Sequence, residues 1–252
     1  MTAFLKIDVC ARCRRSLPWE WLPAVVLNGK ALAGTGVWRS SLIDGLCASC
    51  LQELQTERRK QEEGLRRRDA LIALMGGEKP YREFTFERYE VRPGNRRAFE
   101  SCKQFNPAAE NLYLWGACGV GKTHLSYATA RRCFEETLCV AILPAYQLSR
   151  KARLRGPEQE QAILDEWAAA EMLLLDDLGV GSDTAYVRQL VQEILDTRCF
   201  DDRNGLVITS KYSLDQLAAK LADDSIPSRL AGCCRAIEVT GADRRIAKVQ
   251  SR

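Results

Sequence analysis

Residues 116–123 are Gly-Ala-Cys-Gly-Val-Gly-Lys-Thr, which matches the spacing Gly-x4-Gly-Lys-[Ser/Thr] at every position. Glycines let the backbone curve around a phosphate so that several N–H groups point inward, and a following helix adds the positive end of its dipole. The flanking sequence supplies that context, because 111–115 predict a short strand and 122–136 predict a helix. A glycine-rich turn that holds no ligand is the alternative, and it fits poorly with both flanks present. The stretch therefore predicts a nucleotide-binding loop.

The residues of this loop have distinct expected parts in binding ATP and Mg²⁺. Lys122 would reach the β- and γ-phosphates, and the Thr123 hydroxyl would coordinate Mg²⁺. The remaining residues expected at the nucleotide are Gly116, Gly119, Val120, Gly121 and His124.

Three further apolar runs predict strands that alternate with helices. They are 138–143, 172–177 and 206–210, and each has the length and composition of a buried strand. Residues 95–105 and 183–200 show the apolar spacing of helices. Strands that alternate with helices, without hairpin signals between them, predict an α/β fold with a parallel sheet covered on both faces.

The strand predicted at 172–177 ends in two carboxylates, Asp176 and Asp177. Ligands of parallel sheets bind beyond the carboxyl ends of the strands, so both side chains are expected near the phosphates. Asp176 would hold Mg²⁺ through its water shell, and Asp177 is the candidate to polarise an attacking water. The alternative is a strand that simply ends in polar residues, which the preceding phosphate loop makes weak.

Length and composition restrict the class of protein. The 252 residues allow one large domain or a domain with an appendage, and 46% hydrophobic with 28% charged residues is typical of a globular chain. No run approaches the roughly 20 apolar residues of a membrane span, and the first ten residues lack the apolar segment of a signal peptide. We therefore expect a cytoplasmic protein that does not enter a membrane. In that compartment the eleven cysteines are expected to be thiols or metal ligands rather than disulfides.

The net charge of +4 is unevenly distributed. Residues 1–80 hold 13 Lys and Arg against 9 Asp and Glu, whereas residues 81–252 hold 24 of each kind. Charge alone leaves two interpretations of the N-terminal excess, which are an acidic partner and a solvated helix face.

Two Cys-x2-Cys pairs lie in the N-terminal third, at Cys10 and Cys13 and at Cys47 and Cys50. Each pair can present both sulfurs on one side of a tight turn, so the four thiolates can close a tetrahedron around Zn²⁺. Four protein ligands leave no open position, which indicates a structural site. The alternative is a set of ordinary buried cysteines, and the other seven cysteines show no such spacing.

A long helix is predicted from 51 to 75, rich in charge and interrupted at Gly64. Its start at the second cysteine pair indicates a treble-clef-like arrangement. Gly76, Gly77 and Pro80 mark a break after it. We therefore expect a zinc-binding module at 1–50, a charged helix and linker at 51–80, and the nucleotide-binding domain at 81–252.

Five motifs in order resemble the DnaC/DnaI/IstB group of AAA+ ATPases. They are Gly-Ala-Cys-Gly-Val-Gly-Lys-Thr-His-Leu at 116–125, Leu-Leu-Leu-Asp-Asp-Leu-Gly at 173–179, Ile-Thr-Ser-Lys-Tyr at 208–212, Ser-Arg-Leu at 228–230 and Gly-Ala-Asp-Arg-Arg at 241–245. The resemblance covers roughly 81–252 and implies an AAA+ P-loop NTPase fold. It also implies an ATPase that loads a replicative helicase onto DNA or assists a transposase.

The resemblance assigns three more residues. Arg229 corresponds to the arginine finger, which would act on the ATP of a neighbouring subunit. Arg245 corresponds to the sensor-2 arginine, with Arg244 as the alternative. Lys211 stands where the group usually has the sensor-1 Asn, and because lysine cannot accept a hydrogen bond the resemblance implies slow hydrolysis or a binding switch.

The expected partners follow from the same resemblance. They are a replicative helicase or a transposase, single-stranded DNA, and further copies of this chain in an AAA+ oligomer. The four-cysteine module is similar to that of DnaI-like loaders, which favours the helicase loader. For DNA, the candidate contact is a basic helix at 146–155 that carries Arg150, Lys151, Arg153 and Arg155.

Overall fold

The computed structural model describes residues 7–23, 26–27, 30–31, 36–148, 164–165, 167, 169–180, 184–200 and 205–244. Arg245 and the basic residues Arg150, Lys151, Arg153 and Arg155 lie outside these ranges. Contacts divide the chain into two units, Met1–Asp69 and Ala70–Arg252.

The first unit contains a small antiparallel sheet beside the four paired cysteines. Its three strands are β1 (Ile7–Val9), β2 (Ser16–Pro23) and β5 (Gly36–Ser40), in the order β1-β2-β5. A separate two-stranded ladder joins β3 (Val26–Leu27) to β4 (Lys30–Ala31). The buried apolar cluster of the described residues in this unit consists of Cys10, Cys47 and Cys50, with Leu17, Leu42 and Leu46 packed against it. A core this small makes cross-links or a metal important for stability.

The helix α1 (Ala48–Leu74) confirms the long helix expected at 51–75, but it begins three residues earlier, directly after Cys47. It continues through Gly64, so the expected interruption at that residue is wrong. A glycine costs a helix only about 1 kcal/mol relative to alanine, which the neighbouring Leu, Arg, Glu and Gln residues offset. After α1, Gly76 and Gly77 have φ angles of 83° and 130°, which a continuing helix does not allow.

The second unit is built on a parallel sheet of five strands in the order β10-β6-β9-β8-β7. The strands are β6 (Leu112–Trp115), β7 (Val140–Pro144), β8 (Met172–Leu178), β9 (Leu206–Ser210) and β10 (Arg235–Glu238). The first four confirm the strands expected from the sequence. Strand β10 was not predicted, because at the sheet edge only Ile237 of its four residues is buried.

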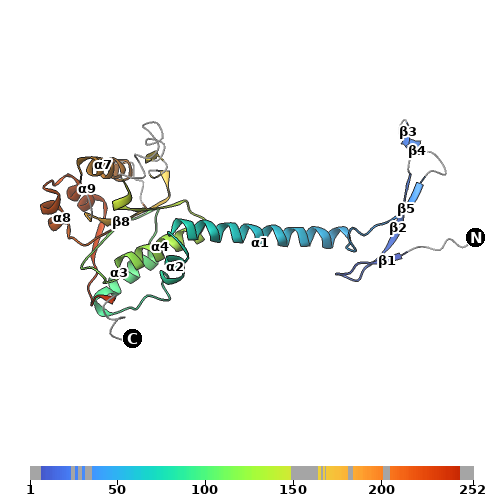
Figure 1. Cartoon of the computed structure of the whole chain (residues 1–252), viewed down its shortest axis with the longest axis horizontal. Helices are drawn as coiled ribbons and strands as arrows, with labels where there is room; N and C mark the ends of the chain where they lie inside the picture. Colours follow the sequence, from blue (N-terminus) through green and yellow to red (C-terminus); the bar gives the residue numbers. More distant parts are fainter. Residues whose placement is uncertain are drawn as a thin grey trace, which may run out of the picture. The chain divides into compact units, whose positions relative to one another are not determined.

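Helices cover both faces of this sheet (Figure 1). Helices α3 (Pro93–Gln104) and α4 (Lys122–Glu135) lie below β8 in the view, whereas α7 (Ala185–Phe200) and α9 (Ser225–Cys233) lie above it. Two shorter helices are α2 (Glu78–Glu83) and α8 (Leu214–Leu221), and a 3-10 turn spans Ala145–Gln147. The parallel sheet with helices on both faces confirms the predicted α/β class.

Alternate side chains of β8 belong to two different buried clusters, one on each face of the sheet. Leu173 and Leu175 pack with α7, α8 and α9, whereas Met172 and Leu174 pack with α3 and α4. All four side chains are fully buried. A central parallel strand therefore has a continuous apolar sequence, since both of its faces are covered.

One disulfide joins Cys199, in the last turn of α7, to Cys233 at the end of α9. This corrects the expectation that no cysteine of the chain is cross-linked. The two residues are 34 positions apart, and only the packing of α7 against α9 brings them together. The other nine cysteines are free.

Among the described residues, no helix is both long and apolar enough to cross a membrane.

Candidate nucleotide site and cysteine cluster

The loop 116–123 connects β6 to α4 at the carboxyl edge of the parallel sheet. Gly116 has a φ angle of 143°, and a Cβ at this position would lie 2.2 Å from the carbonyl oxygen of Val239. Gly121 precedes α4 with a φ angle of 105°, and a Cβ there would lie 2.9 Å from the ring of Tyr89. Both positions therefore require glycine, because any side chain would strain the backbone and collide with a neighbour.

Lys122 lies inside the curve of this loop. Its Nζ donates hydrogen bonds of 2.8 Å to the carbonyl oxygens of Gly116 and Ala117, and the residue is 6% exposed. Val120 is buried in the core below, so its side chain anchors the loop. The arrangement places an ammonium group and the N-terminus of α4 at one point, which suits an anionic ligand.

Thr123 and Asp176 meet at the start of α4. The Thr123 hydroxyl donates to Asp176 Oδ1 at 3.1 Å, and the Thr209 hydroxyl donates to the same oxygen at 2.6 Å. Burial, assisted by the nearby charge of Asp177, raises the pKa of Asp176 to about 6, although the hydrogen bonds from the two hydroxyl groups oppose the shift. A hydroxyl and a carboxylate are the hard oxygen ligands that Mg²⁺ prefers, so this pair fits that ion.

Asp177 follows Asp176 at a point where the backbone of β8 departs from regular strand geometry. Successive residues of a regular strand face opposite sides of the sheet. The register of β8 against β9 shifts between Leu175 and Leu178, and Asp177 has a φ angle of 59° in the left-handed region. Its N–H donates to Thr209 Oγ1 at 2.9 Å, and its side chain lines the cleft beside the loop. The bulge thus brings both carboxylates to one site.

A cleft of about 850 Å³ opens above the phosphate loop, within the range of ligand pockets. The sequence-predicted residues that line it are Gly119, Gly121, Lys122, Thr123, His124, Asp177 and Lys211. The cleft also includes residues from the segment before the first strand of the sheet, among them Phe84, Arg88, Glu90 and Arg92.

His124 and Lys211 both line the cleft and have different neighbours. His124 Nε2 lies 2.7 Å from the carbonyl oxygen of Thr85, and its ring packs against those of Phe84 and Tyr89. Lys211 follows β9, and its Nζ lies 4.9 Å from the centroid of the Tyr212 ring. A side-chain hydrogen bond with Tyr212 raises the pKa of this lysine.

Arg244, the alternative sensor-2 residue, lies in the cleft. Its guanidinium carbon is 4.1 Å from the centroid of the Tyr89 ring, and its Nη2 donates to the carbonyl oxygen of Glu90. The backbone N–H of Arg244 donates to Gly119 O at 3.1 Å, which ties the end of the described chain to the phosphate loop. Arg245 lies outside the described residues.

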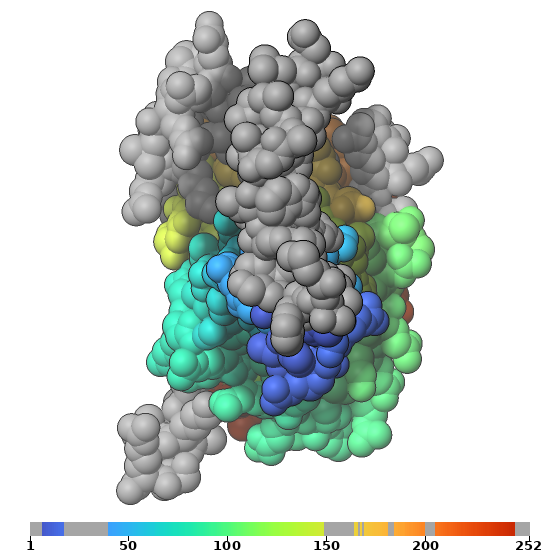
Figure 2. Space-filling model, turned by 90° about the vertical axis from the view of Figure 1, so that its right-hand side faces the viewer, coloured from blue at the N-terminus to red at the C-terminus, as the bar shows by residue number. Residues whose placement is uncertain are grey.

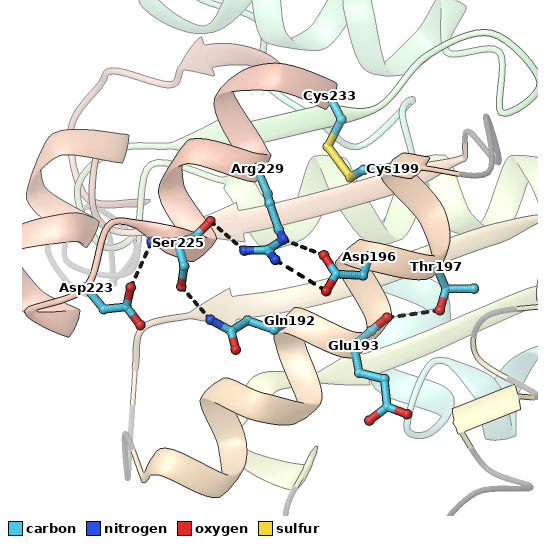
Figure 3. A network of polar contacts seen from close by, with 9 residues as sticks. All are labelled: Gln192, Glu193, Asp196, Thr197, Cys199, Asp223, Ser225, Arg229 and Cys233. Carbon is cyan, nitrogen blue, oxygen red and sulfur yellow. Dashed lines mark hydrogen bonds and ion pairs between the residues drawn. A yellow bond between two sulfur atoms is a disulfide. The ribbon is translucent and has the colours of Figure 1, made fainter.

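Arg229 is not among the residues that line this cleft. It lies on α9, on the other face of the sheet, and forms an ion pair with Asp196 of α7 (Figure 3). The Nη2 group donates to Asp196 Oδ2 at 3.4 Å, and Nη1 donates to the carbonyl oxygen of Ser225 at 3.3 Å. The structure therefore brings together the other described site residues of the second unit and leaves Arg229 outside the group.

Comparison with models of protein families matches residues 48–251 to the family described as IstB-like ATP binding protein. The chain belongs to this family. Its members bind ATP and are generally ATPases. The five-stranded parallel sheet and its helices form the AAA+ fold of the solved DnaC structure.

This IstB-like protein is also similar to replicative helicase loaders. It is 20% identical to DnaC of Escherichia coli (strain K12) over 232 residues, which cover 88% of each chain. It is 23% identical to DnaC of Buchnera aphidicola subsp. Schizaphis graminum over 133 residues, and there it spans only 54% of that relative's length. The crystal structure of DnaI matches 64% of this chain and 90% of its own, with 26% identity and a TM-score of 0.54.

The four paired cysteines of this IstB-like chain form one cluster in the first unit. One sulfur from each lies within 4.8 Å of all the others, with Cys13 Sγ and Cys47 Sγ 3.7 Å apart. Three of the four are buried and Cys13 is exposed. Figure 2 shows the described residues 7–17, which carry the first pair, in dark blue. Four sulfur ligands from two Cys-x2-Cys pairs are the donor set of structural zinc, so this group could hold that ion.

Hydrogen bonds within the cluster favour the thiolate form that binds metals. Backbone N–H groups of Cys13 and Cys47 lower the pKa of Cys10 to about 6. A side-chain hydrogen bond with Ser49 lowers the pKa of Cys47. Burial raises the pKa of Cys50 to about 12, so the four thiols differ in how readily they ionise without a metal.

Two residues that shape the site, Thr209 and Tyr89, carry no functional signal of their own in the sequence. Thr209 lies in the quoted Ile-Thr-Ser motif, yet its contact with Asp176 depends on strand pairing. Tyr89 is 5% exposed, and among the described residues its hydroxyl has no hydrogen-bond partner. Burial raises the Tyr89 pKa to about 12. No local pattern marks a tyrosine in a loop as the neighbour of Gly121 and Arg244.

Proposed function

We propose that this chain is an ATPase that loads a replicative DNA helicase onto single-stranded DNA. The similarity to E. coli DnaC over 88% of both chains supports this function. The observation that carries it is the cleft in which Lys122, Asp177 and Lys211 converge above the phosphate loop.

Each residue of the cleft has a proposed role in ATP hydrolysis. Lys122 binds the β- and γ-phosphates, and Thr123 with Asp176 would hold Mg²⁺, which neutralises phosphate charge when it is bound. Asp177 accepts a proton from the water that attacks the γ-phosphorus, while the bond from that phosphorus to the β–γ bridging oxygen breaks and ADP leaves. Lys211 contacts the γ-phosphate as a cation, and Arg244 or Arg245 serves as the sensor-2 residue.

Arg229 acts on the ATP of a neighbouring subunit, so the active form is an oligomer. Its absence from the lining of its own cleft supports this role, because a residue on α9 acts on phosphate only when a second copy presents its cleft. Self-association around single-stranded DNA then couples assembly to ATP, and hydrolysis releases the complex.

Mixing two inactive variants tests the shared site. Lys122→Ala removes the ATP site but keeps the finger, and Arg229→Ala removes the finger but keeps the ATP site. Each variant alone should hydrolyse ATP at background rate, whereas the mixture should recover part of the wild-type turnover. Background turnover in the mixture at every ratio and concentration would contradict the shared site.

The N-terminal module, 1–50, is proposed to bind zinc and to hold the helicase, with 51–80 as helix and linker and 81–252 as the ATPase domain. To test the partner, the tagged protein is incubated with a lysate of its native cell, with ATP and with ADP. The replicative helicase should bind in a manner that depends on the nucleotide. Deletion of 1–50 should remove that binding.

A second function is favoured by the family match to IstB-like proteins. In that case the chain assists a DNA transposase, and the same experiment would recover a transposase and no helicase.

A third function is favoured by Lys211, which cannot accept a hydrogen bond from the attacking water. The chain would then be an adaptor that uses ATP binding as a switch, with turnover at background even when DNA and assembled protein are present.

A further inference from the structure

Helices α7 and α8–α9 are joined by polar contacts at regular intervals. Arg188 Nη1 donates to Leu221 O at 2.7 Å, Gln192 Nε2 donates to Ser225 Oγ, and Arg229 pairs with Asp196. Consecutive members are four positions apart on each side, so all three α7 side chains lie on one face of the helix. The last contact of the series therefore belongs to a packed helix interface and is not an isolated surface ion pair.

Asp196 engages a defined edge of the Arg229 guanidinium (Figure 3). Arg229 Nε donates to Oδ1 and Nη2 donates to Oδ2, which is a two-point contact. The Ser225 carbonyl accepts a third hydrogen bond from Nη1. A guanidinium has five N–H donors, so contacts to the described residues leave two, one on each terminal nitrogen. Those two N–H groups can donate to a phosphate while the Asp196 carboxylate remains hydrogen-bonded to Arg229.

We propose that Asp196 is a positioning residue that orients Arg229 toward the γ-phosphate of a neighbouring subunit. This inference rests on the proposed role of Arg229 in a shared ATP site. Arginine has many rotamers, and a long side chain at an interface loses freedom when it binds. A carboxylate that fixes the plane of the guanidinium before assembly reduces that loss, so its effect should appear in the rate of hydrolysis.

The test uses the mixture of variants, because there only one subunit supplies the finger. The acceptor subunit carries Arg229→Ala, and the donor subunit carries Lys122→Ala. A second donor carries Asp196→Asn in addition, which removes the charge and one strong acceptor but keeps the shape. Turnover is measured as each donor is titrated into a fixed concentration of acceptor, up to a plateau.

If Asp196 positions Arg229, the plateau of ATP turnover should be about 5- to 30-fold lower with the second donor. The reason is that an arginine held in the right orientation stabilises the transition state more than a freely rotating one. A merely structural role would shift the donor concentration at half-plateau and leave the plateau unchanged, which would overturn the inference. An unchanged curve, or a higher plateau because Asp196 restrains Arg229, would overturn it as well.

Gln192→Ala in the donor is the matched control. It removes the neighbouring polar contact between α7 and α9 and leaves the Arg229–Asp196 pair in place. Its plateau should equal that of the first donor, and thermal unfolding by circular dichroism verifies that each donor is folded. If this control lowers the plateau as much as Asp196→Asn does, packing rather than orientation is responsible and the inference is wrong.

Different results would contradict the shared ATP site and the positioning role of Asp196. If the first donor restores no turnover at all, the shared site and the positioning role are both wrong. If the first donor restores turnover and Asp196→Asn changes nothing, only the positioning role is wrong.

Discussion

Thr123 and Asp176 are 53 residues apart in the chain, and a hydrogen bond of 3.1 Å joins their side chains. Thr123 lies in the first turn of the helix after the phosphate loop, and Asp176 lies near the end of the central strand β8. The contact aligns an anion-binding loop with an acidic strand end, so one edge of the sheet can bind both phosphate and its metal ion.

Lys122→Ala should weaken ATP binding by at least about 100-fold, because it removes a buried charge that faces the loop. Binding of a fluorescent ATP analogue measures the loss. Lys220→Ala, at an exposed lysine in the last turn of α8, is the control and should bind as the wild type does. If the Lys122 variant bound the ATP analogue with an affinity within threefold of wild type, the nucleotide would not bind at this loop.

In the absence of nucleotide and metal, Asp176→Asn should stabilise the protein, but only at pH values at which the carboxyl group of Asp176 would be ionised. The pKa of Asp176 is about 6 in the folded protein against 3.8 ordinarily, so the folded state binds the proton more tightly. At pH 4 and below, the carboxyl is mostly neutral in the folded state and the variant should gain little. As pH rises through 6, the ionised group destabilises the fold by up to about 3 kcal/mol, which the amide avoids.

Urea unfolding at pH 4.5 and pH 7.5 measures this difference for Asp176. The gain in unfolding free energy of the variant should be larger at the higher pH, whereas its binding of Mg²⁺ with ATP should be weaker. Equal gains at both pH values would show that burial does not control this carboxyl.

Zinc should be bound at one ion per chain, and loss of a ligand should remove it. Cys10→Ser and Cys47→Ser should each abolish the bound metal and reduce the folding of the first unit, because binding and folding of such a site are coupled. Elemental analysis of protein purified without chelators measures the content. Cys139→Ser, at an exposed free thiol outside the cluster, should keep its zinc. Absence of zinc from the wild type would remove the module from the proposal.

Lys211→Asn should raise ATP turnover by about tenfold, because an amide at the end of β9 can accept a hydrogen bond and orient the attacking water. Nucleotide affinity should change little, since Lys122 remains. Steady-state ATPase assays at a concentration that allows assembly give the comparison. A fall in turnover would mean that the cation itself stabilises the γ-phosphate in the transition state.

The sequence alone was sufficient for features that depend on local spacing. The phosphate loop is set by its glycines, because each must adopt a backbone angle that other residues avoid. The strand that ends in Asp176 and Asp177 follows from an apolar run of strand length. The four cysteines of the cluster are recognised because two residues between ligands suit a turn around a metal.

Tertiary structure decided what those local features face. The bulge in β8 turns Asp177 into the cleft, and strand pairing brings Thr209 to Asp176. Packing of α7 against α9 pairs Arg229 with Asp196 and places Cys199 beside Cys233. These contacts join residues about 33 positions apart, and their energy depends on where whole helices and strands pack. Composition and periodicity fix which face of an element is buried, but only the folded chain fixes which neighbour that face meets.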